Sequence, residues 1–372
     1  MPYFQYMPDF EEYTARAKRR VEDEQLDREL PAGFPTKLTG GLVRDADSVS
    51  KDFDYNYHLT AEDLKEIQDA LHHFKSSNKV LAEISPETFP LPKLHKTLRD
   101  ISKEIHNDHG FKVVRGLPVD DFTREENVTQ GKPADVLLAH VKDLSQGRPT
   151  ADIPGPVVTA EKQVFHTDAG DVIALFCLSE GYTGGESYLA STCHIYNELA
   201  ATRPDLIRTL YEPWAFDDFA PTEDKYQLRP LLYYQPSTKK DPERLIIQYS
   251  RRNLTGYLDR KRSSKIPALT EAQAEALDAV HYNAEKHSIS LDFRKGDIQF
   301  ANNLSVLHAR GAFTDSKYKQ RHLLRLWLRD PEFEWTKNQE LKERFDRVYH
   351  NVTVEKAIFP LEPTIRSRNV AT

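Results

Sequence analysis

Two histidine-containing segments that lie far apart in the sequence most constrain how this chain can fold. His166 and Asp168 flank Thr167, so in a β-strand both side chains would project from the same face. His308 lies in a second, distant segment. Two imidazoles and one carboxylate suit ferrous iron and leave coordination positions open. We therefore predict that the fold brings separate strands together around one metal ion.

The tripeptide alone is weak evidence for a metal site. The chain contains 14 histidines, and a chance His-x-Asp in which each side chain satisfies a local hydrogen bond is the simpler interpretation. Two neighbouring segments strengthen the metal interpretation. They are the glycine turn Gly184-Gly185-Glu186-Ser187 and the run from Asn302 to Arg310, which contains His308.

The segment 321–329 alternates between two kinds of side chain, as expected of a strand with two different faces. One face carries Arg321, Leu323, Arg325, Trp327 and Arg329, and the other carries His322, Leu324, Leu326 and Leu328. Either the leucines face the core and the arginines face water, or the leucines pack against helices and the arginines line a cavity. A guanidinium binds a carboxylate through two parallel hydrogen bonds, so the second arrangement would suit a carboxylate ligand. Spacing alone leaves both open.

Together these motifs resemble the taurine dioxygenase and clavaminate synthase-like family of Fe(II)/2-oxoglutarate-dependent dioxygenases, over residues 60–330. The resemblance implies a mainly β fold with flanking helices and a double-stranded β-helix (jelly-roll) core. It implies His166, Asp168 and His308 as the catalytic iron ligands. It also implies that the Ser187 hydroxyl and Arg321 bind 2-oxoglutarate, and that Arg325 reaches the cosubstrate or an anionic substrate.

The resemblance further implies the reaction. The cofactors would be Fe(II), 2-oxoglutarate and O2, with succinate and CO2 released as an unactivated C–H bond is oxidised. The substrate would be a small, carboxylate-bearing metabolite, and hydroxylation, desaturation and ring formation all stay open. Lys162, by its strand parity with His166, and Phe313, as an apolar wall, are candidate substrate contacts beside Arg325. A solvated lysine at a strand start explains Lys162 equally well.

Two alternatives remain. An iron-dependent, cupin-type oxygenase or isomerase would keep the iron ligands without using 2-oxoglutarate, but the Ser187 and Arg321 pair argues against it. A catalytically silent binding protein on the same fold would be expected to have lost a ligand, whereas His166, Asp168 and His308 are all present.

The composition of the chain limits the kinds of partner and the compartment that we expect for it. A net charge of −7 gives no basic footprint for nucleic acid. No apolar run approaches the roughly 20 residues needed to cross a membrane. The two cysteines, Cys177 and Cys193, make a disulfide framework improbable. We expect a cytoplasmic protein with a small-molecule substrate, and we leave open whether it forms a homo-oligomer.

The chain is predicted to form a single dioxygenase domain, 1–372, with an N-terminal arm and helix in 1–59, a catalytic core in 60–330 and a tail in 331–372. The expected helices cover residues 11–24, 60–74, 92–107, 132–144, 197–211 and 270–287. The expected strands cover 110–116, 171–179, 245–249, 297–300 and 321–329. Residues 214–229 are expected to form an irregular lid.

Overall fold

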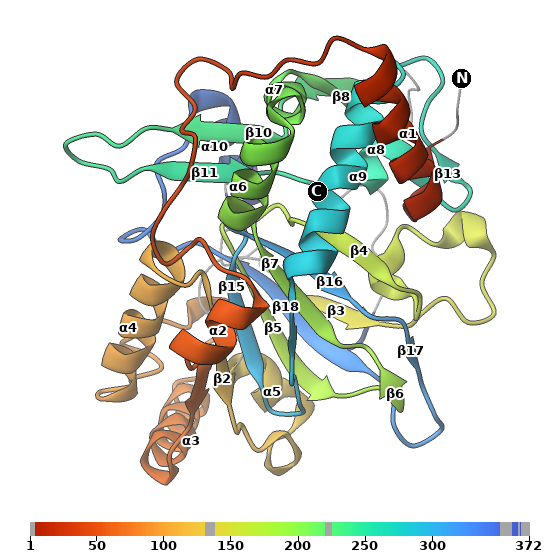
Figure 1. Cartoon of the computed structure of the whole chain (residues 1–372). Coiled ribbons are helices and arrows are strands. Elements are labelled where there is room, and N and C mark those ends of the chain that lie inside the picture. The colour runs from red at the N-terminus through yellow and green to blue at the C-terminus, as the bar shows by residue number, and fades with distance from the viewer. Residues whose placement is uncertain (1–3, 131–137, 220–224, 350–358, 364, 366–372) are drawn as a thin grey trace.

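Two β-sheets lie face to face at the centre of the molecule (Figure 1). The computed structural model describes residues 4–130, 138–219, 225–349, 359–363 and 365. Buried side chains from both sheets meet between them, among them Phe111, Ile173 and Leu189. The predicted mixture of β-structure with flanking helices is therefore confirmed.

The larger sheet has six strands. In spatial order they are β1 (Asn56–His58), β2 (Phe111–Arg115), β15 (Ile298–Asn302), β5 (Val172–Ser179), β18 (His322–Leu328) and β3 (Ala139–Lys142). Only the pairing of β1 with β2 is parallel. The smaller, antiparallel sheet contains β14 (Ile289–Leu291), β7 (Ser187–Ser191), β16 (Val306–Arg310) and β4 (Gln163–His166).

Four further strand pairs lie outside these two sheets, and all are antiparallel. They are β6 (Thr183–Gly184) with β17 (Phe313–Thr314), β8 (Trp214–Asp217) with β9 (Tyr226–Arg229), β10 (Leu232–Gln235) with β11 (Arg244–Ile247), and β12 (Gly256–Tyr257) with β13 (Arg260–Lys261).

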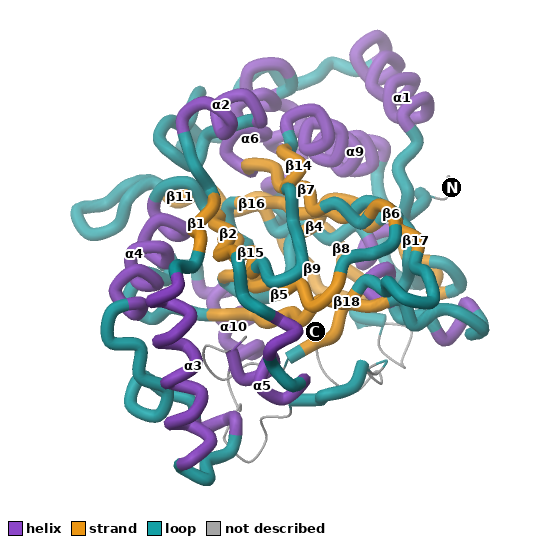
Figure 2. Tube along the Cα trace, turned by 90° about the horizontal axis from the view of Figure 1, so that it is seen from below, coloured by secondary structure: helices purple, strands orange, loops and turns teal. Residues whose placement is uncertain are grey.

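Helices cover the outer faces of the two sheets (Figures 1 and 2). The described residues form α1 (Phe10–Asp23), α2 (Ala46–Asp52), α3 (Ala61–Ser76), α4 (Leu94–Asn107), α5 (Arg124–Gln130), α6 (Thr192–Thr202), α7 (Pro204–Tyr211), α8 (Arg252–Thr255), α9 (Glu271–His287) and α10 (Gln339–Tyr349). Helices α3 and α4 pack on the larger sheet. Helices α6, α7 and α9 pack on the smaller sheet. None of the helices in the described ranges is both long and apolar enough to span a lipid bilayer.

The helices that the sequence predicts best carry strong start signals. Thr60 accepts a hydrogen bond from the backbone N–H of Asp63, and the Asp63 side chain accepts one from the Thr60 N–H, so α3 begins with a capping box. Thr270 and Gln273 form the same arrangement at the start of α9. These caps satisfy backbone N–H groups that lack a partner within the helix.

Three predicted elements are wrong in detail. Of the expected helix 132–144, residues 131–137 lie outside the described residues, and Ala139–Lys142 form β3 because they pair with β18. The expected helix 197–211 is two helices, because Pro204 cannot continue α6 and instead occupies the first turn of α7. The expected lid contains the buried strand β8 paired with β9, with residues 220–224 outside the described residues.

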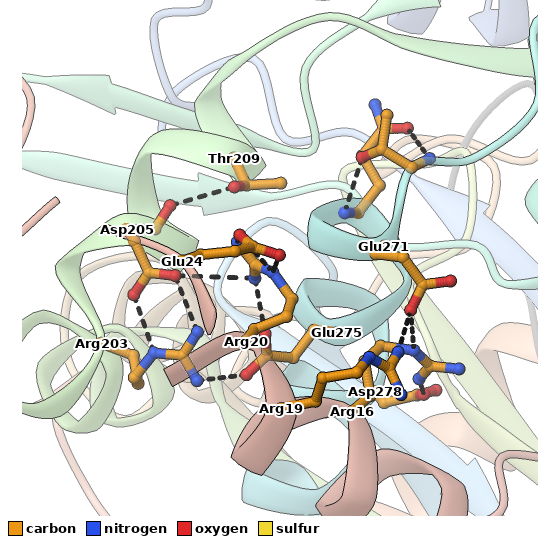
Figure 3. A network of polar contacts seen from close by, with 12 residues as sticks. Arg16, Arg19, Arg20, Glu24, Arg203, Asp205, Thr209, Glu271, Glu275 and Asp278 are labelled. Atoms are coloured by element: carbon orange, nitrogen blue, oxygen red, sulfur yellow. Dashed lines mark hydrogen bonds and ion pairs between the residues drawn. The ribbon is translucent and has the colours of Figure 1, made fainter. Parts of the chain in front are cut away.

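Buried ion pairs fasten the N-terminal helix to the core (Figure 3). We call this group the arm–helix ion network, and it comprises Arg16, Arg20, Arg203, Asp205, Glu275 and Asp278. Arg20 of α1 contacts Glu275 of α9 at 2.5 Å, and Arg203, which precedes α7, contacts the other oxygen of the same carboxylate. The Glu275 side chain is fully buried. Each charge therefore depends on its partners for the stabilisation that water would otherwise give.

Candidate metal centre

His166, Asp168 and His308 converge at one end of the smaller sheet. His166 ends β4, and its Cα partner across the antiparallel ladder is His308 of β16. The two imidazole centroids lie 4.1 Å apart, and His166 Nε2 lies 3.6 Å from Asp168 Oδ1. One ligand atom from each residue lies within 4.8 Å of the other two. The predicted convergence is present, and metal binding by these residues stays a prediction.

Hydrogen bonds orient the first imidazole for metal binding. The Nδ1 atom of His166 lies 2.9 Å from the Val164 carbonyl oxygen, an arrangement that places the proton on Nδ1. The lone pair of Nε2 then points toward a ligand position, where the Gln163 amide nitrogen lies 3.0 Å away. His308 Nδ1 is buried with no hydrogen-bond partner among the described residues. The donor set therefore fits a metal bound through neutral imidazoles.

Three residues hold the Asp168 segment in place. Its Oδ2 accepts hydrogen bonds from Trp327 Nε1 at 2.8 Å and from Arg325 Nη1 at 3.0 Å. Its backbone N–H donates to Asn303 Oδ1, and the Asn303 amide donates back to the Asp168 carbonyl oxygen. None of these contacts uses Oδ1, which faces His166. Partners of this kind fix how a ligating carboxylate points.

The protonation states also suit a cation. Burial and the neighbouring His166 lower the pKa of His308 to about 3, and burial lowers the pKa of His166. Burial alone would raise the pKa of Asp168, but Arg325, the two histidines and the Trp327 hydrogen bond together lower it below its ordinary value. At neutral pH the site therefore contains two neutral imidazoles and one carboxylate, the forms that bind metal.

These shifts predict metal binding that is nearly independent of pH from 8 to 6. Two imidazoles with ordinary pKa values near 6.5 would take up protons as the pH falls and would weaken binding roughly 15-fold over this range. Imidazoles with lowered pKa values stay neutral, so we expect a change below about threefold. Anaerobic Fe(II) titrations at pH 8 and pH 6 measure this change in affinity. A tenfold loss of Fe(II) affinity at pH 6 would contradict the assignment of these residues as metal ligands.

Replacing Trp327 with phenylalanine is expected to weaken metal binding about tenfold, because it removes one donor to Asp168 and keeps an aromatic ring at this position. The matched control is Trp335→Phe, which removes an indole hydrogen bond to the His106 carbonyl oxygen in another part of the core. Equal metal affinities in both variants would show that the Trp327 hydrogen bond has no role at the site.

The faces of β18 settle the two interpretations of the arginine strand. Leu324, Leu326 and Leu328 pack in the cluster formed with α3 and α4. On the other face, Arg325 and Trp327 contact Asp168. The arginine face is thus turned inward, as the second interpretation predicts.

The guanidinium of Arg321 is buried and has no ion pair with a carboxylate among the described residues, although the Arg321 backbone N–H donates to Asp315 Oδ1. Arg321 is 5% exposed, and within the part of the chain that the structure describes its Nη1 has no hydrogen-bond partner. The guanidinium carbons of Arg310 and Arg321 lie 5.0 and 5.3 Å from the centroid of the Phe313 ring. Gly185 makes room, since a Cβ there would lie 2.8 Å from Arg321 Nε. Burial lowers the Arg321 pKa to about 10, and an anion would relieve that unfavourable burial.

Ser187 lies two residues beyond Gly185, at the start of β7. Its hydroxyl donates to Gln299 Oε1 at 2.7 Å, and Gln299 Nε2 is buried without a partner in the described structure. This leaves a hydrogen-bond donor near Ser187. Gln299 was not predicted from the sequence, although a polar residue within the apolar strand β15 is a usable signal.

Lys162 is not brought together with the other candidates. Its ammonium pairs with Glu285 of α9, on the helix side of the smaller sheet. The parity inference is wrong because β4 begins only at Gln163, so the alternation of the strand does not extend to Lys162. Trp327 and Asn303 are contacts that the sequence analysis did not assign. Trp327 is two residues after Arg325 and therefore lies on the same face of the strand, so the sequence was sufficient to predict that both side chains point the same way.

Comparison with known proteins gives one family match and two relatives in sequence. The sequence model described as "Taurine catabolism dioxygenase TauD, TfdA family" matches residues 74–327. A taurine hydroxylase-like protein of Stachybotrys chartarum is 35% identical over 371 aligned residues, covering 92% of this chain and 93% of that protein. FR-33289 synthase of Streptomyces rubellomurinus is 25% identical over 309 aligned residues, covering 78% and 90%.

Two solved structures share the fold. Asparagine oxygenase in complex with Fe(II), hydroxyasparagine and succinate has a TM-score of 0.52 at 16% identity, covering 74% of this chain and 93% of its own. The non-heme iron oxygenase OrfP with iron and alpha-ketoglutaric acid has a TM-score of 0.52 at 17% identity, covering 73% and 93%. At this level of identity the likeness is one of architecture.

Proposed function

The chain belongs to the taurine catabolism dioxygenase TauD, TfdA family, and we propose that it oxidises an unactivated C–H bond of a small, carboxylate-bearing molecule. As a member it is a non-haem iron dioxygenase that uses Fe(II), 2-oxoglutarate and O2. This membership argues against both an iron enzyme that works without 2-oxoglutarate and a silent binding protein. We also assign the two packed sheets to the double-stranded β-helix.

The single observation that carries the site assignment is the approach of three ligand atoms within 4.8 Å of one another. In our proposal His166, Asp168 and His308 hold Fe(II). Bound iron and 2-oxoglutarate supply the oxidising power from O2, with release of succinate and CO2. The protein residues position the ligands, exclude water and select the C–H bond.

Arg321 is proposed to bind the far carboxylate of 2-oxoglutarate beside Ser187. Because the Ser187 hydroxyl donates its proton to Gln299 Oε1, the second donor of this pair is the Gln299 amide Nε2. The support is that the guanidinium is buried and has an unpartnered Nη1. A carboxylate there would form charge-assisted hydrogen bonds in a site of low dielectric. The Phe313 ring keeps the guanidinium in place and forms an apolar wall beside it.

Arg325 is proposed to meet the substrate carboxylate. It contacts Asp168 through Nη1 and is 16% exposed, so its other donors stay available to a ligand beside the metal. Succinate release with pairs of acids and their amides tests this class. We expect the acid of each productive pair to support turnover and its amide to be at least about tenfold poorer. Equal turnover of both would exclude a carboxylate-bearing substrate.

Replacing Arg321 with alanine is expected to raise the KM for 2-oxoglutarate at least about 30-fold, because it leaves the carboxylate buried without its partner. Arg321→Lys keeps the charge but loses the paired donors, so we expect an intermediate value. Arg294→Ala, at a side chain 65% exposed, is the control. An unchanged KM in Arg321→Ala would reject the role given to Arg321 and leave the iron ligands untested.

A further inference from the structure

A second cluster of two histidines and one carboxylate lies outside the candidate iron site. We propose that Asp45, His194 and His287 bind a second divalent transition-metal ion, with Zn²⁺ as the representative ion. One ligand atom from each residue lies within 4.8 Å of the other two. The two imidazole centroids are 4.3 Å apart. The proposal does not depend on the proposed function.

The three residues come from separate parts of the fold. Asp45 caps the N-terminus of α2, His194 lies in the first turn of α6 and His287 is the last residue of α9. Their ligand atoms lie within 4.8 Å of one another, so the start of α2, the first turn of α6 and the end of α9 meet at this point. A bound ion would therefore join the N-terminal arm to two helices that cover the smaller sheet.

Each of the two imidazoles has a ring nitrogen that can bind a metal ion. The Nε2 atoms of His194 and His287 are both buried and have no hydrogen-bond partner among the described residues. Buried polar atoms are nearly always paired in folded proteins, so two unpaired ring nitrogens in adjacent imidazoles call for an explanation. A metal ion can accept a lone pair from each of the two nitrogens at once. A hydrogen bond between the two neutral rings would use the lone pair of only one nitrogen, because the other nitrogen would have to donate a proton.

Asp45 has a free coordination atom despite its capping role. Its Oδ1 accepts hydrogen bonds from the Ser48 backbone N–H and the Ser48 hydroxyl, both at 2.9 Å. Neither contact uses Oδ2. One carboxylate can therefore cap α2 and ligate an ion.

A fourth ligand is close by. Glu198 Oε2, one turn further along α6, lies 3.8 Å from His287 Nε2. Zinc accepts imidazole nitrogens and carboxylate oxygens as ligands and is usually bound by four of them. Asp45 and His287 also line a small cavity, which leaves room beside them.

The arm already docks on α6 near this cluster, which suggests what the ion would do. The Leu38 N–H donates to Asn197 Oδ1 at 2.7 Å, and the Asn197 amide donates to the Leu38 carbonyl oxygen at 3.0 Å. An ion bound only in the folded state would stabilise this docking, since binding shifts the folding equilibrium toward the state that binds. We assign the ion a structural role.

The test counts zinc ions per chain. Metal-free protein is equilibrated with Zn²⁺, dialysed and assayed by elemental analysis. The unmutated chain should retain about two ions, because both clusters carry ligands that zinc accepts. The variant His166→Ala/His308→Ala, which lacks the proposed iron ligands, should retain about one. Retention of no ion by this variant would overturn the proposal, whatever the candidate iron site retains.

Two mild variants localise the second ion. Asp45→Asn keeps a side chain that caps helices well but removes the anionic ligand. His287→Gln removes one imidazole. Placed in the His166→Ala/His308→Ala background, each should weaken Zn²⁺ binding at least about tenfold and abolish the zinc-dependent rise in melting temperature. His72→Gln, at an exposed histidine of α3, is the matched control. Unchanged affinity in both variants would overturn the assignment.

Activity separates this inference from the proposed function. In the otherwise unmutated chain, Asp45→Asn and His287→Gln should leave turnover of 2-oxoglutarate with Fe(II) unchanged while retaining one zinc ion fewer. Melting temperatures without zinc report whether the variants fold. Loss of zinc with retained turnover supports a second site, whereas equal zinc content in the variants and the unmutated chain rejects it.

Discussion

Replacing Asp168 with alanine is expected to abolish both iron retention and the turnover of 2-oxoglutarate. The change removes the one carboxylate in the cluster, and it leaves the Arg325 and Trp327 donors without their acceptor. A cation would then face two neutral imidazoles beside an unpaired guanidinium. We expect Fe(II) affinity to fall at least about 100-fold, more than for loss of a residue that only supports a ligand. Anaerobic metal analysis and succinate release measure it.

The Asp168→Asn variant tests the negative charge of Asp168 separately from the packing of its side chain. The amide oxygen can still accept from Trp327 and Arg325, but the negative charge is gone, so iron should be lost while the melting temperature changes little. The control is Asp69→Ala, because Asp69 is an exposed acid of α3. Stoichiometric iron in Asp168→Ala would remove this carboxylate from the metal site.

Replacing Glu275 with alanine is expected to lower the free energy of unfolding by about 3–5 kcal/mol, because it leaves the buried Arg20 and the partly buried Arg203 without their shared partner. Arg20 and Arg203 both contact the Glu275 carboxylate, whose side chain is fully buried (Figure 3). Removing one member of a buried ion pair costs far more than the net value of the pair. Urea unfolding followed by circular dichroism measures the change.

Glu22→Ala on α1 is the matched control for Glu275→Ala. Glu22 is 60% exposed and lies 3.9 Å from Lys18, so water screens the pair, and we expect a change within about 0.5 kcal/mol. Similar small values for both variants would show that the arm–helix ion network does not anchor α1 to the core.

The sequence predicts an element well where the signals are local. Helix α1, helix α3 and helix α9 have clear caps or apolar periodicity, and the structure has them within two residues of the predicted bounds. Strand β3 was missed because its partner β18 is distant in the sequence, and only tertiary pairing makes Ala139–Lys142 extended. The strand β8 was missed for the same kind of reason, since it depends on pairing with β9.

In the candidate site, the sequence can predict residues that lie in the same strand as a recognised motif. The alternation in 321–329 put Arg325 and Trp327 on one face of a strand without deciding which face is inward, and the structure turns that face toward Asp168. The His-x-Asp motif identified two of the three converging residues, but Asp168 lies beyond the end of β4, so strand alternation does not account for its approach to His308. Gln299 and Asn303 act through partners far away in the sequence, so the local sequence marks them as polar residues in or near a strand but does not reveal their contacts. Lys162 failed because strand parity holds only within a strand, and the strand starts one residue later.

The central claim is that three side chains and a buried guanidinium form one site for Fe(II) and 2-oxoglutarate. Anaerobic addition of both to metal-free protein, followed by visible absorption, tests it most directly. We predict a charge-transfer band that saturates at about one Fe(II) per chain, disappears in Asp168→Ala, and needs more 2-oxoglutarate in Arg321→Ala. A band of equal intensity in Asp168→Ala, or no band in the unmutated protein, would contradict the account.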